Sequence, residues 1–303
     1  MKYFMKNTIS FVLIFIWLNI LSIYTYSQSD SVKHFRHIGD LELVRDSMPS
    51  RINESSGLIF FREKLWTHND SGDGPYIYVL DSAAQKILQI ITVENAKNVD
   101  WEEITQDSAF IYMCDFGNNY GLRNNLTIYK INKSDIPDSG NVSVNAEKIE
   151  FSYKNKPAPS VKLKRSQYDM EAMICYHDTL VLFSKNWEKP YCNIYFIPAK
   201  AGIYEIEPIK TIYLNGLVTA ASLSPNQKQL LLLGYHDYVP FVFLLNDFSL
   251  QNIQVNEAIY RRYDAKFCYQ TEGIAFVKHD EAYISCERNI LKPNSVFRIR
   301  LLY

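Results

Sequence analysis

Carboxylate, amide and basic side chains recur at two fixed places in a unit that repeats five times along this sequence. The first place is the start of the first apolar run of each unit, which is occupied by Glu54, Asp100, Glu102, Glu103, Asp169, Glu171, Thr219 and Glu272. The second place is the end of the second apolar run, which is occupied by His68, Asn69, Asp70, Asp115, Asn118, Lys185, Asn186, His236, Asp237, Glu287 and Arg288. Eleven of these residues are acidic (seven in the first set and four in the second), and two are Lys or Arg. Carboxylate and amide oxygens are the ligands that Ca²⁺ and Mg²⁺ prefer, so the pattern indicates divalent-cation chemistry.

The repeated unit consists of short runs of β-branched and aromatic residues, separated by Asn, Asp, Gly, Ser and Pro. Such runs predict strands joined by turns, and almost nothing after residue 30 has helical periodicity. The equivalent apolar positions of the five copies are Leu58, Ile104, Met173, Leu223 and Ile274, at spacings of 46, 69, 50 and 51 residues. A period of roughly 40–50 residues with three or four strands per unit is typical of a β-propeller.

We therefore expect an all-β fold, a single propeller domain over residues 28–303 with five four-stranded blades. Fourth strands are predicted over 87–93, 147–153 and 209–214, whereas the fifth copy lacks one. The strand-like run 37–44 precedes the first copy, and pairing it with the last blade would close the ring without a free edge. Six blades are the alternative, if the 69-residue interval contains a degenerate unit.

The propeller fold would bring the two sets of polar residues together. In each blade the first strand lines the central channel and successive strands alternate in direction, so the start of the first strand and the end of the second lie on one face near the axis. Eleven acids against two bases predict a strongly acidic channel mouth on a near-neutral protein. For each acid, a structural role is the alternative, because a carboxylate there can also accept backbone hydrogen bonds from the next blade. Tyrosines near predicted loops of this face could stack on a sugar ring, namely Tyr76, Tyr120, Tyr191, Tyr235 and Tyr238.

Several phrases of the sequence resemble a loosely defined group of exported bacterial β-propellers. They are residues 54–58 (ESSGL), 65–72 (LWTHNDSG), 100–104 (DWEEI), 115–118 (DFGN) and 272–276 (EGIAF). The group includes the SdiA-regulated family and grades into YWTD- and NHL-type propellers and into calcium-dependent phosphotriesterase-like and gluconolactonase-like propellers. The resemblance covers the whole mature chain, and it indicates the fold more strongly than the activity, since propellers carry many unrelated functions.

The resemblance also implies a metal site. The phosphotriesterase-like and lactonase-like propellers hold a divalent cation with acidic and asparagine side chains from different blades. By position, the residues that would hold Ca²⁺ or Mg²⁺ here are Glu54, Asp115, Asn118, Asp169 and Glu272. Such an ion could polarise a phosphoryl or lactone oxygen, or lower the pKa of a bound water. Lys185 and Arg288 could then contact an anionic group of the substrate.

These residues are compatible with two functions. The first is a binding module that holds a divalent cation or a small polar ligand, or docks a protein partner, with His68, Lys185, His236 and Arg288 as ligand contacts. The second is a metal-dependent hydrolase of the phosphoesterase or lactonase type, with His68 or His236 as general base. The fourth copy contributes only Thr219-Ala220-Ala221, a gap in the ring that favours binding. The sequence contains no HExxH, GxSxG, Walker or GxGxxG motif.

The first 30 residues have the three-part layout of a secretory signal peptide. Lys2 and Lys6 form a positive segment, an apolar stretch follows over 9–23, and Thr25 and Ser27 stand at the −3 and −1 positions of a cleavage site. We expect cleavage after residue 27 and a periplasmic or secreted location, with an uncleaved signal anchor as the alternative. The apolar stretch is shorter than the roughly 20 residues that span a bilayer comfortably.

The overall charge and the cysteines add two further expectations. Formal net charge is −1, which argues against a nucleic-acid-binding surface, because such a surface needs a clustered basic excess. We expect a monomer without membrane contact once the signal is removed. Cys175–Cys192 and Cys268–Cys286 are possible hairpin-scale disulfides, and free buried thiols in strands are the alternative.

Overall fold

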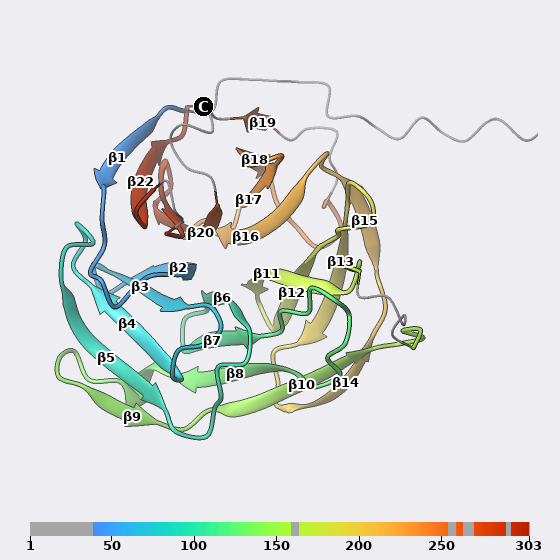
Figure 1. Cartoon of the computed structure of the whole chain (residues 1–303), viewed down its shortest axis with the longest axis horizontal. Helices are drawn as coiled ribbons and strands as arrows, with labels where there is room; N and C mark the ends of the chain where they lie inside the picture. Colours follow the sequence, from blue (N-terminus) through green and yellow to red (C-terminus); the bar gives the residue numbers. More distant parts are fainter. Residues whose placement is uncertain (1–38, 159–163, 254–258, 263–269, 289–291, 303) are drawn as a thin grey trace, which may run out of the picture. The chain divides into compact units, whose positions relative to one another are not determined.

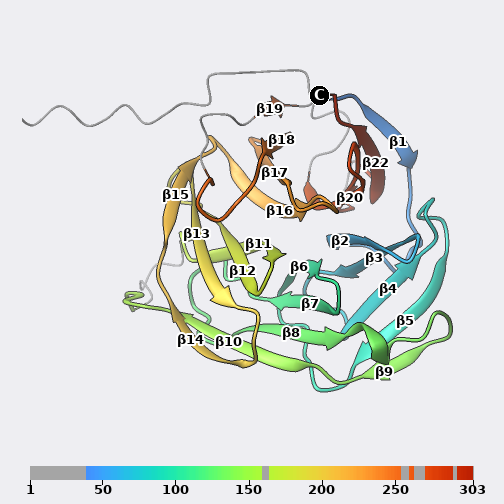
Figure 2. The same ribbon diagram turned by 180° about the vertical axis from the view of Figure 1, so that it is seen from behind.

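Five small β-sheets surround a central axis in the described part of the chain (Figure 1). The computed structural model describes residues 39–158, 164–253, 259–262, 270–288 and 292–302, all within the compact unit Val32–Tyr303. The innermost strand of each sheet contacts the innermost strands of its two neighbours, so the sheets close into a ring. Figure 2 shows the same ring from behind. The predicted all-β propeller with five blades is confirmed.

The first two blades have five strands each. Blade 1, from the axis outward, consists of β2 (Ser55–Phe61), β3 (Lys64–Asn69), β4 (Tyr76–Leu80), β5 (Ile87–Val93) and β9 (Val142–Val144). Blade 2 consists of β6 (Trp101–Gln106), β7 (Phe110–Asp115), β8 (Leu126–Asn132), β10 (Glu147–Tyr153) and β14 (Gly202–Ile206). The fifth strand of each runs parallel to its neighbour, unlike the four antiparallel strands inside it. These two strands are additions to the four that the repeat predicts.

The other three blades have four antiparallel strands each, as predicted. Blade 3 consists of β11 (Asp169–Tyr176), β12 (Thr179–Lys185), β13 (Tyr191–Pro198) and β15 (Lys210–Tyr213). Blade 4 consists of β16 (Leu217–Leu223), β17 (Gln229–His236), β18 (Val239–Asn246) and β19 (Ile259–Arg262). Blade 5 consists of β20 (Thr271–Lys278), β21 (Glu281–Cys286), β22 (Ser295–Arg300) and β1 (Leu41–Arg45).

The ring closes as the sequence predicts, through a strand from the front of the chain. Strand β1 pairs antiparallel with β22, with Leu41 opposite Ile299. Across the same seam, Arg298 forms an ion pair with Glu42. The strand begins later than expected, at Leu41, and residues 37 and 38 lie outside the described part of the chain. One blade therefore holds residues from both ends of the described chain.

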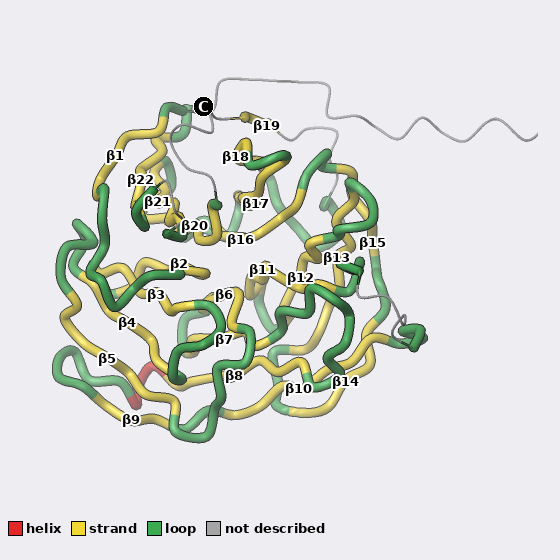
Figure 3. Tube along the Cα trace, viewed as in Figure 1, coloured by secondary structure: helices red, strands yellow, loops and turns green. Residues whose placement is uncertain are grey.

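Two strands, β9 and β14, each pair with the outer edge of the blade that precedes them in the chain. After β8 the chain forms the short 3-10 helix η1 (Lys133–Asp135, red in Figure 3) and then places β9 on the outer edge of blade 1. After β13 it places β14 on the outer edge of blade 2. The 69-residue interval between Ile104 and Met173 is thus occupied by strands of blades 1 and 2, and the described residues form five blades rather than six.

A separate apolar cluster fills each of the five junctions between neighbouring blades. The junction of blades 3 and 4, for example, buries Ile174, Phe183, Phe241 and Phe243. Stacked sheets pack through the side chains of their facing surfaces, and this burial is the main stabilising contribution. Because each blade is packed on both faces, the strand ends near the axis are held in fixed positions.

The structure contradicts one of the two possible disulfides. Cys175 and Cys192 are both free and buried, so a Cys175–Cys192 disulfide is wrong. The physical reason is their placement on opposite faces of blade 3, since Cys175 packs toward blade 2 and Cys192 toward blade 4. Cys286 is disulfide-bonded, and Cys268 lies outside the described residues.

The predicted signal segment, residues 1–27, also lies outside the described residues. Across the part of the chain that the structure describes, there is no helix with the length and apolar character needed to cross a membrane.

Candidate functional site

A β-bulge interrupts the start of every innermost strand. In blade 1 the register shifts between Ser55 and Gly57, and an equivalent shift occurs in the other four blades. The residues skipped by these shifts are buried, and they are Ser56, Glu102, Glu171, Thr219 and Glu272. A bulge redirects the side chain that it leaves unpaired. The three glutamates of this set line one cavity.

This cavity has a volume of about 480 Å³. It is lined by Asp70, Glu102, Asn119, Arg165, Glu171, Lys185, Trp187, Leu217, Tyr235, Asp237, Tyr238, Gln270, Glu272 and Glu287. Six of these residues are acidic and two are basic. The cavity thus lies where innermost strands begin and second strands end, and it has the acid excess that the repeat pattern predicts for that mouth.

Three carboxylates from blades 1 and 2 lie close enough to share one ion. Asp70 follows β3, Asp100 precedes β6, and Glu102 is the bulge residue of β6. One carboxylate oxygen from each lies within 4.8 Å of the other two. The hydroxyl of Ser56 contacts Oε2 of Glu102 at 3.4 Å, and Asp115 accepts the N–H of Asp100 at 3.1 Å. We refer to Asp70, Asp100 and Glu102 as the carboxylate triad.

The surroundings of the three triad carboxylates disfavour their ionised forms. Burial is the main cause that raises the pKa of Asp70 to about 6 and that of Asp100 to about 7, and it raises the pKa of Glu102 well above its ordinary range. Repulsion by neighbouring carboxylates adds to each shift, from Glu272 on Asp70 and from Glu171 on Glu102. A divalent cation bound among these oxygens would remove that repulsion, because an opposite charge favours the ionised form.

Lys185 supplies a buried positive charge on the blade 3 side of the cavity. Its Nζ lies 3.0 Å from Oε2 of Glu171, and both side chains are almost fully buried. Burial alone lowers the pKa of Lys185, but Glu171 and Glu272 outweigh it and raise that pKa well above its ordinary value. Lys185 therefore keeps its ammonium charge, although burial also raises the pKa of its partner Glu171 well above the ordinary range.

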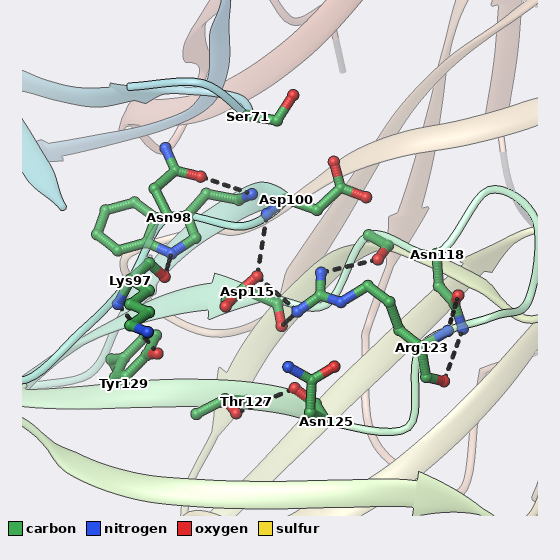
Figure 4. A network of polar contacts seen from close by, with 12 residues as sticks. Ser71, Lys97, Asn98, Asp100, Asp115, Asn118, Arg123, Asn125, Thr127 and Tyr129 are labelled. Carbon is green, nitrogen blue, oxygen red and sulfur yellow. Dashed lines mark hydrogen bonds and ion pairs between the residues drawn. The ribbon is translucent and has the colours of Figure 1, made fainter. Parts of the chain in front are cut away.

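Asp115, one of the five residues implied by the resemblance, forms a buried ion pair (Figure 4). Its Oδ1 lies 2.7 Å from Nη2 of Arg123, which also donates to the carbonyl of Gly117 through Nη1. The same oxygen accepts the backbone N–H of Asp100. Asp115 thus positions the backbone of a triad residue and anchors the loop after β7.

Asp169 and Asn118 also have protein partners. Asp169 accepts the backbone N–H of Asn118 at 2.7 Å with one oxygen, and the indole N–H of Trp187 at 2.7 Å with the other. The side-chain oxygen of Asn118 accepts the N–H of Arg123 at 2.8 Å. These bonds join the loop after β7 to blade 3, which is the structural role considered for acids at such positions.

The remaining two residues implied by the resemblance lie in different surroundings. Glu54 is exposed, and its backbone carbonyl accepts the N–H of Asp70 at 2.9 Å. Glu272 is buried, with 5% of its surface exposed, and lines the cavity. Of those five residues, Glu272 alone lines the cavity.

The four predicted ligand contacts are also dispersed. Lys185 lines the cavity. His68 is fully buried against Trp101, and burial lowers its pKa to about 4. His236 is partly exposed beside Asp237 in a smaller adjoining pocket, and Arg288 is exposed. No histidine of the described residues lines the 480 Å³ cavity.

The sequence interpretation missed five residues that line the cavity, and they are Asn119, Arg165, Trp187, Leu217 and Gln270. Trp187 lies two residues beyond the end of β12, and the guanidinium of Arg165 lies 3.9 Å from its ring centroid. Extending the strand-end positions by two residues would have included Trp187. Arg165 follows an irregular excursion with no strand pattern, so no sequence signal places it near the axis.

Comparison with known proteins supports the fold alone. No known protein family matches the sequence, and no curated protein matches it. The PQQ-bound form of an aldose sugar dehydrogenase from Streptomyces coelicolor has a similar structure, with a TM-score of 0.53, 8% identity, and coverage of 89% of this chain and 100% of that chain. The Cps50 (Swd1) β-propeller domain of Myceliophteria thermophila gives a TM-score of 0.44 at 11% identity, covering 86% and 88% of the two chains. A luciferin-regenerating enzyme gives 0.41 at 9% identity, covering 86% and 95%.

Proposed function

We propose that this protein is a ligand-binding propeller that holds a divalent cation at the carboxylate triad. The observation that carries the proposal is the approach of three carboxylate oxygens, from two blades, to within 4.8 Å of one another. A cavity of about 480 Å³ next to the triad gives a ligand access to the ion. This set replaces most of the residues implied by family resemblance, because Asp115, Asn118 and Asp169 already have protein partners.

The composition of the triad, three carboxylates from the protein, favours calcium over magnesium. Ca²⁺ binds oxygen at about 2.3–2.6 Å, so two ligands on opposite sides of the ion are separated by roughly 5 Å. Mg²⁺ binds at about 2.0–2.1 Å, which limits the same separation to about 4.2 Å. Mg²⁺ also keeps several waters and usually takes one or two carboxylates, whereas Ca²⁺ takes six to eight oxygen ligands, so three carboxylates within 4.8 Å of one another suit Ca²⁺ better.

The family relationship is part of the same proposal. The triad falls within two of the phrases that resemble the exported SdiA-regulated and gluconolactonase-like propellers, since Asp70 lies in 65–72 and Asp100 and Glu102 lie in 100–104. The signal-like first 27 residues support export to the periplasm or the medium, which we likewise propose, and we propose that the exported protein is a monomer.

Binding is favoured over the two catalytic alternatives. With His68 or His236 as general base, a hydrolase would need one of these rings in the cavity, and neither lines it. PQQ, named for the Streptomyces enzyme, is an anion, and six carboxylates against two basic residues oppose an anionic cofactor.

Thermal unfolding of the chelator-treated protein with added Ca²⁺ or Mg²⁺ tests the proposal. A ligand bound only by the folded state stabilises it, by about 2.7 kcal/mol at a hundredfold excess over its Kd. We expect Ca²⁺ to raise the melting temperature and Mg²⁺ to raise it less. Asp100→Asn and Glu102→Gln should each reduce the calcium effect, and Glu54→Gln, an exposed carboxylate outside the cavity, should preserve it. An unchanged melting temperature with both ions would disprove cation binding.

A further inference from the structure

Glu272 is a buried carboxylate that lines the cavity and makes no hydrogen bond or ion pair with the described residues. Only 5% of its surface is exposed. Lys185 interacts electrostatically with Glu272, but its ion pair, at 3.0 Å, is with Glu171. Leaving a buried charged group without a partner costs more than an ordinary hydrogen bond provides. An unpartnered group facing a cavity therefore indicates a ligand.

Blades 4 and 5 form one side of the cavity around Glu272, with Lys185 of blade 3 interacting with it, whereas the triad belongs to blades 1 and 2. Glu287, at the end of β21, accepts the side-chain N–H of Gln270 with one oxygen, at 3.0 Å. From blade 4, the rings of Tyr235 and Tyr238 stack at 5° with centroids 6.1 Å apart, the first buried and the second exposed. We call Glu272, Glu287, Tyr235 and Tyr238 the blade 4–5 side of the cavity.

The cavity already holds one ammonium group in such surroundings. Nζ of Lys185 pairs with Glu171 and lies 5.2 Å from the ring centroid of Trp187 and 5.6 Å from that of Tyr235. Carboxylates and aromatic faces together bind ammonium groups, through charge-assisted hydrogen bonds and through cation–π attraction. The blade 4–5 side offers the same two kinds of group to a ligand.

We propose that the blade 4–5 side of the cavity binds the protonated amine of a small organic ligand, with Glu272 as its principal acceptor. Neither Glu272 nor Glu287 belongs to the triad, so the amine subsite is tested separately from the metal site. An anionic ligand is disfavoured, because the cavity carries four more acidic than basic side chains (six against two).

Three cyclohexane derivatives that share one ring and differ in charge test this subsite. They are cyclohexylamine, cyclohexanol and cyclohexanecarboxylate, titrated at pH 7 in chelator and followed by saturation-transfer NMR and calorimetry. We expect the amine to bind about tenfold more tightly than the alcohol, as a charged hydrogen bond provides, and the carboxylate to bind most weakly. Absence of saturable amine binding, or equal binding of amine and alcohol, would overturn the proposal.

Variants separate this subsite from the triad. Glu272→Gln should remove the preference for the amine and leave cyclohexanol binding unchanged, with Glu287→Gln giving a smaller loss in the same direction. Asp100→Asn, which alters the triad, and Glu54→Gln, which lies outside the cavity, should both retain the preference. A preference that survives both Glu272→Gln and Glu287→Gln would assign the amine to another site. Calcium binding without amine selectivity, or the reverse, would show which of the two proposals fails.

Discussion

Glu103 and Ala221 connect blades 2 and 4 directly across the ring. Oε2 of Glu103 accepts a hydrogen bond of 2.9 Å from the backbone N–H of Ala221, and Oε1 accepts the N–H of Ile104 at 3.0 Å. The backbone N–H of Met173, in blade 3, also donates to this carboxylate. Glu103 is fully buried and follows the bulge residue Glu102, so one side chain joins three blades next to the cavity.

Glu103→Ala should therefore destabilise the whole fold. The substitution leaves three buried backbone donors without an acceptor, each costing about 1–3 kcal/mol, so we expect a loss of about 3–5 kcal/mol in the free energy of unfolding. Urea unfolding followed by circular dichroism measures it. Glu54→Ala, on the exposed start of blade 1, should change stability by about 0.5 kcal/mol or less. Equal losses in the two variants would contradict a connecting role for Glu103.

Asp115 and Asp100 should have separable effects on stability and on cation binding. Asp115→Asn removes one charge from the buried pair with Arg123, and we expect it to cost about 2 kcal/mol of stability while the calcium-dependent rise in melting temperature persists. Asp100→Asn should do the opposite, with little loss of stability in chelator and a reduced calcium effect. Melting curves of both variants with and without Ca²⁺ distinguish the two roles. If Asp115→Asn alone lost the calcium effect, Asp115 rather than Asp100 would be the calcium ligand.

Without a cation, the fold should become less stable as pH rises from 5 to 8. The pKa values of Asp70 and Asp100 are raised to about 6 and about 7 from an ordinary value of 3.8, so the folded protein keeps protons that the unfolded chain releases. Their stabilising contribution is complete below about pH 4 and is lost as pH rises through 7.

The matched variant for this prediction is Asp100→Asn, which cannot ionise at that position. In chelator, its melting temperature should approach that of the unmodified protein at pH 5 and exceed it increasingly toward pH 8. A constant difference across this range would show that Asp100 titrates with an ordinary pKa.

Trp187 should report on occupancy of the cavity. Of the three tryptophans described, Trp66 and Trp101 are fully buried in blade junctions, whereas Trp187 is partly exposed and lines the cavity. Ligand binding should change the fluorescence of Trp187. Trp187→Phe should remove that change while keeping an aromatic ring at this position. The substitution also removes the hydrogen bond to Asp169, for which we expect a cost of about 1–2 kcal/mol in urea unfolding. A ligand-dependent signal that persists in Trp187→Phe would place the responsive indole elsewhere.

The repeat pattern predicts the fold well because each blade is built from local hairpins. Strands β5 and β10 have the predicted bounds, and β15 differs from the predicted 209–214 by one residue at each end. Strands β9 and β14 were not assigned as the fifth strands of blades 1 and 2. Each pairs in parallel with a strand of the preceding blade, and such a partner cannot be identified from the local alternation of apolar and polar residues.

The site was predictable in position but not in detail. Strand-end positions correctly gathered Asp70, Glu102 and Glu272 among the polar candidates for one mouth. They could not show which acids have partners, because Arg123 reaches Asp115 from a loop outside the repeat. The bulges matter too, since a one-residue shift decides whether Glu102 or Glu103 lines the cavity.

The pairing of β1 with β22 constrains the order in which the molecule can be made. Leu41 and Ile299 are neighbours across this seam, so roughly 260 residues must be synthesised between them before the pair can form. For a flexible chain of that length the closure entropy is about 5 kcal/mol, larger than for the short hairpins within each blade. The cavity draws side chains from all five blades, so a nascent chain that lacks its last blade has only fragments of the binding site. Ligand affinity should therefore appear only once the ring has closed. A bound ligand, in contact with several blades, should in turn slow the opening of the ring.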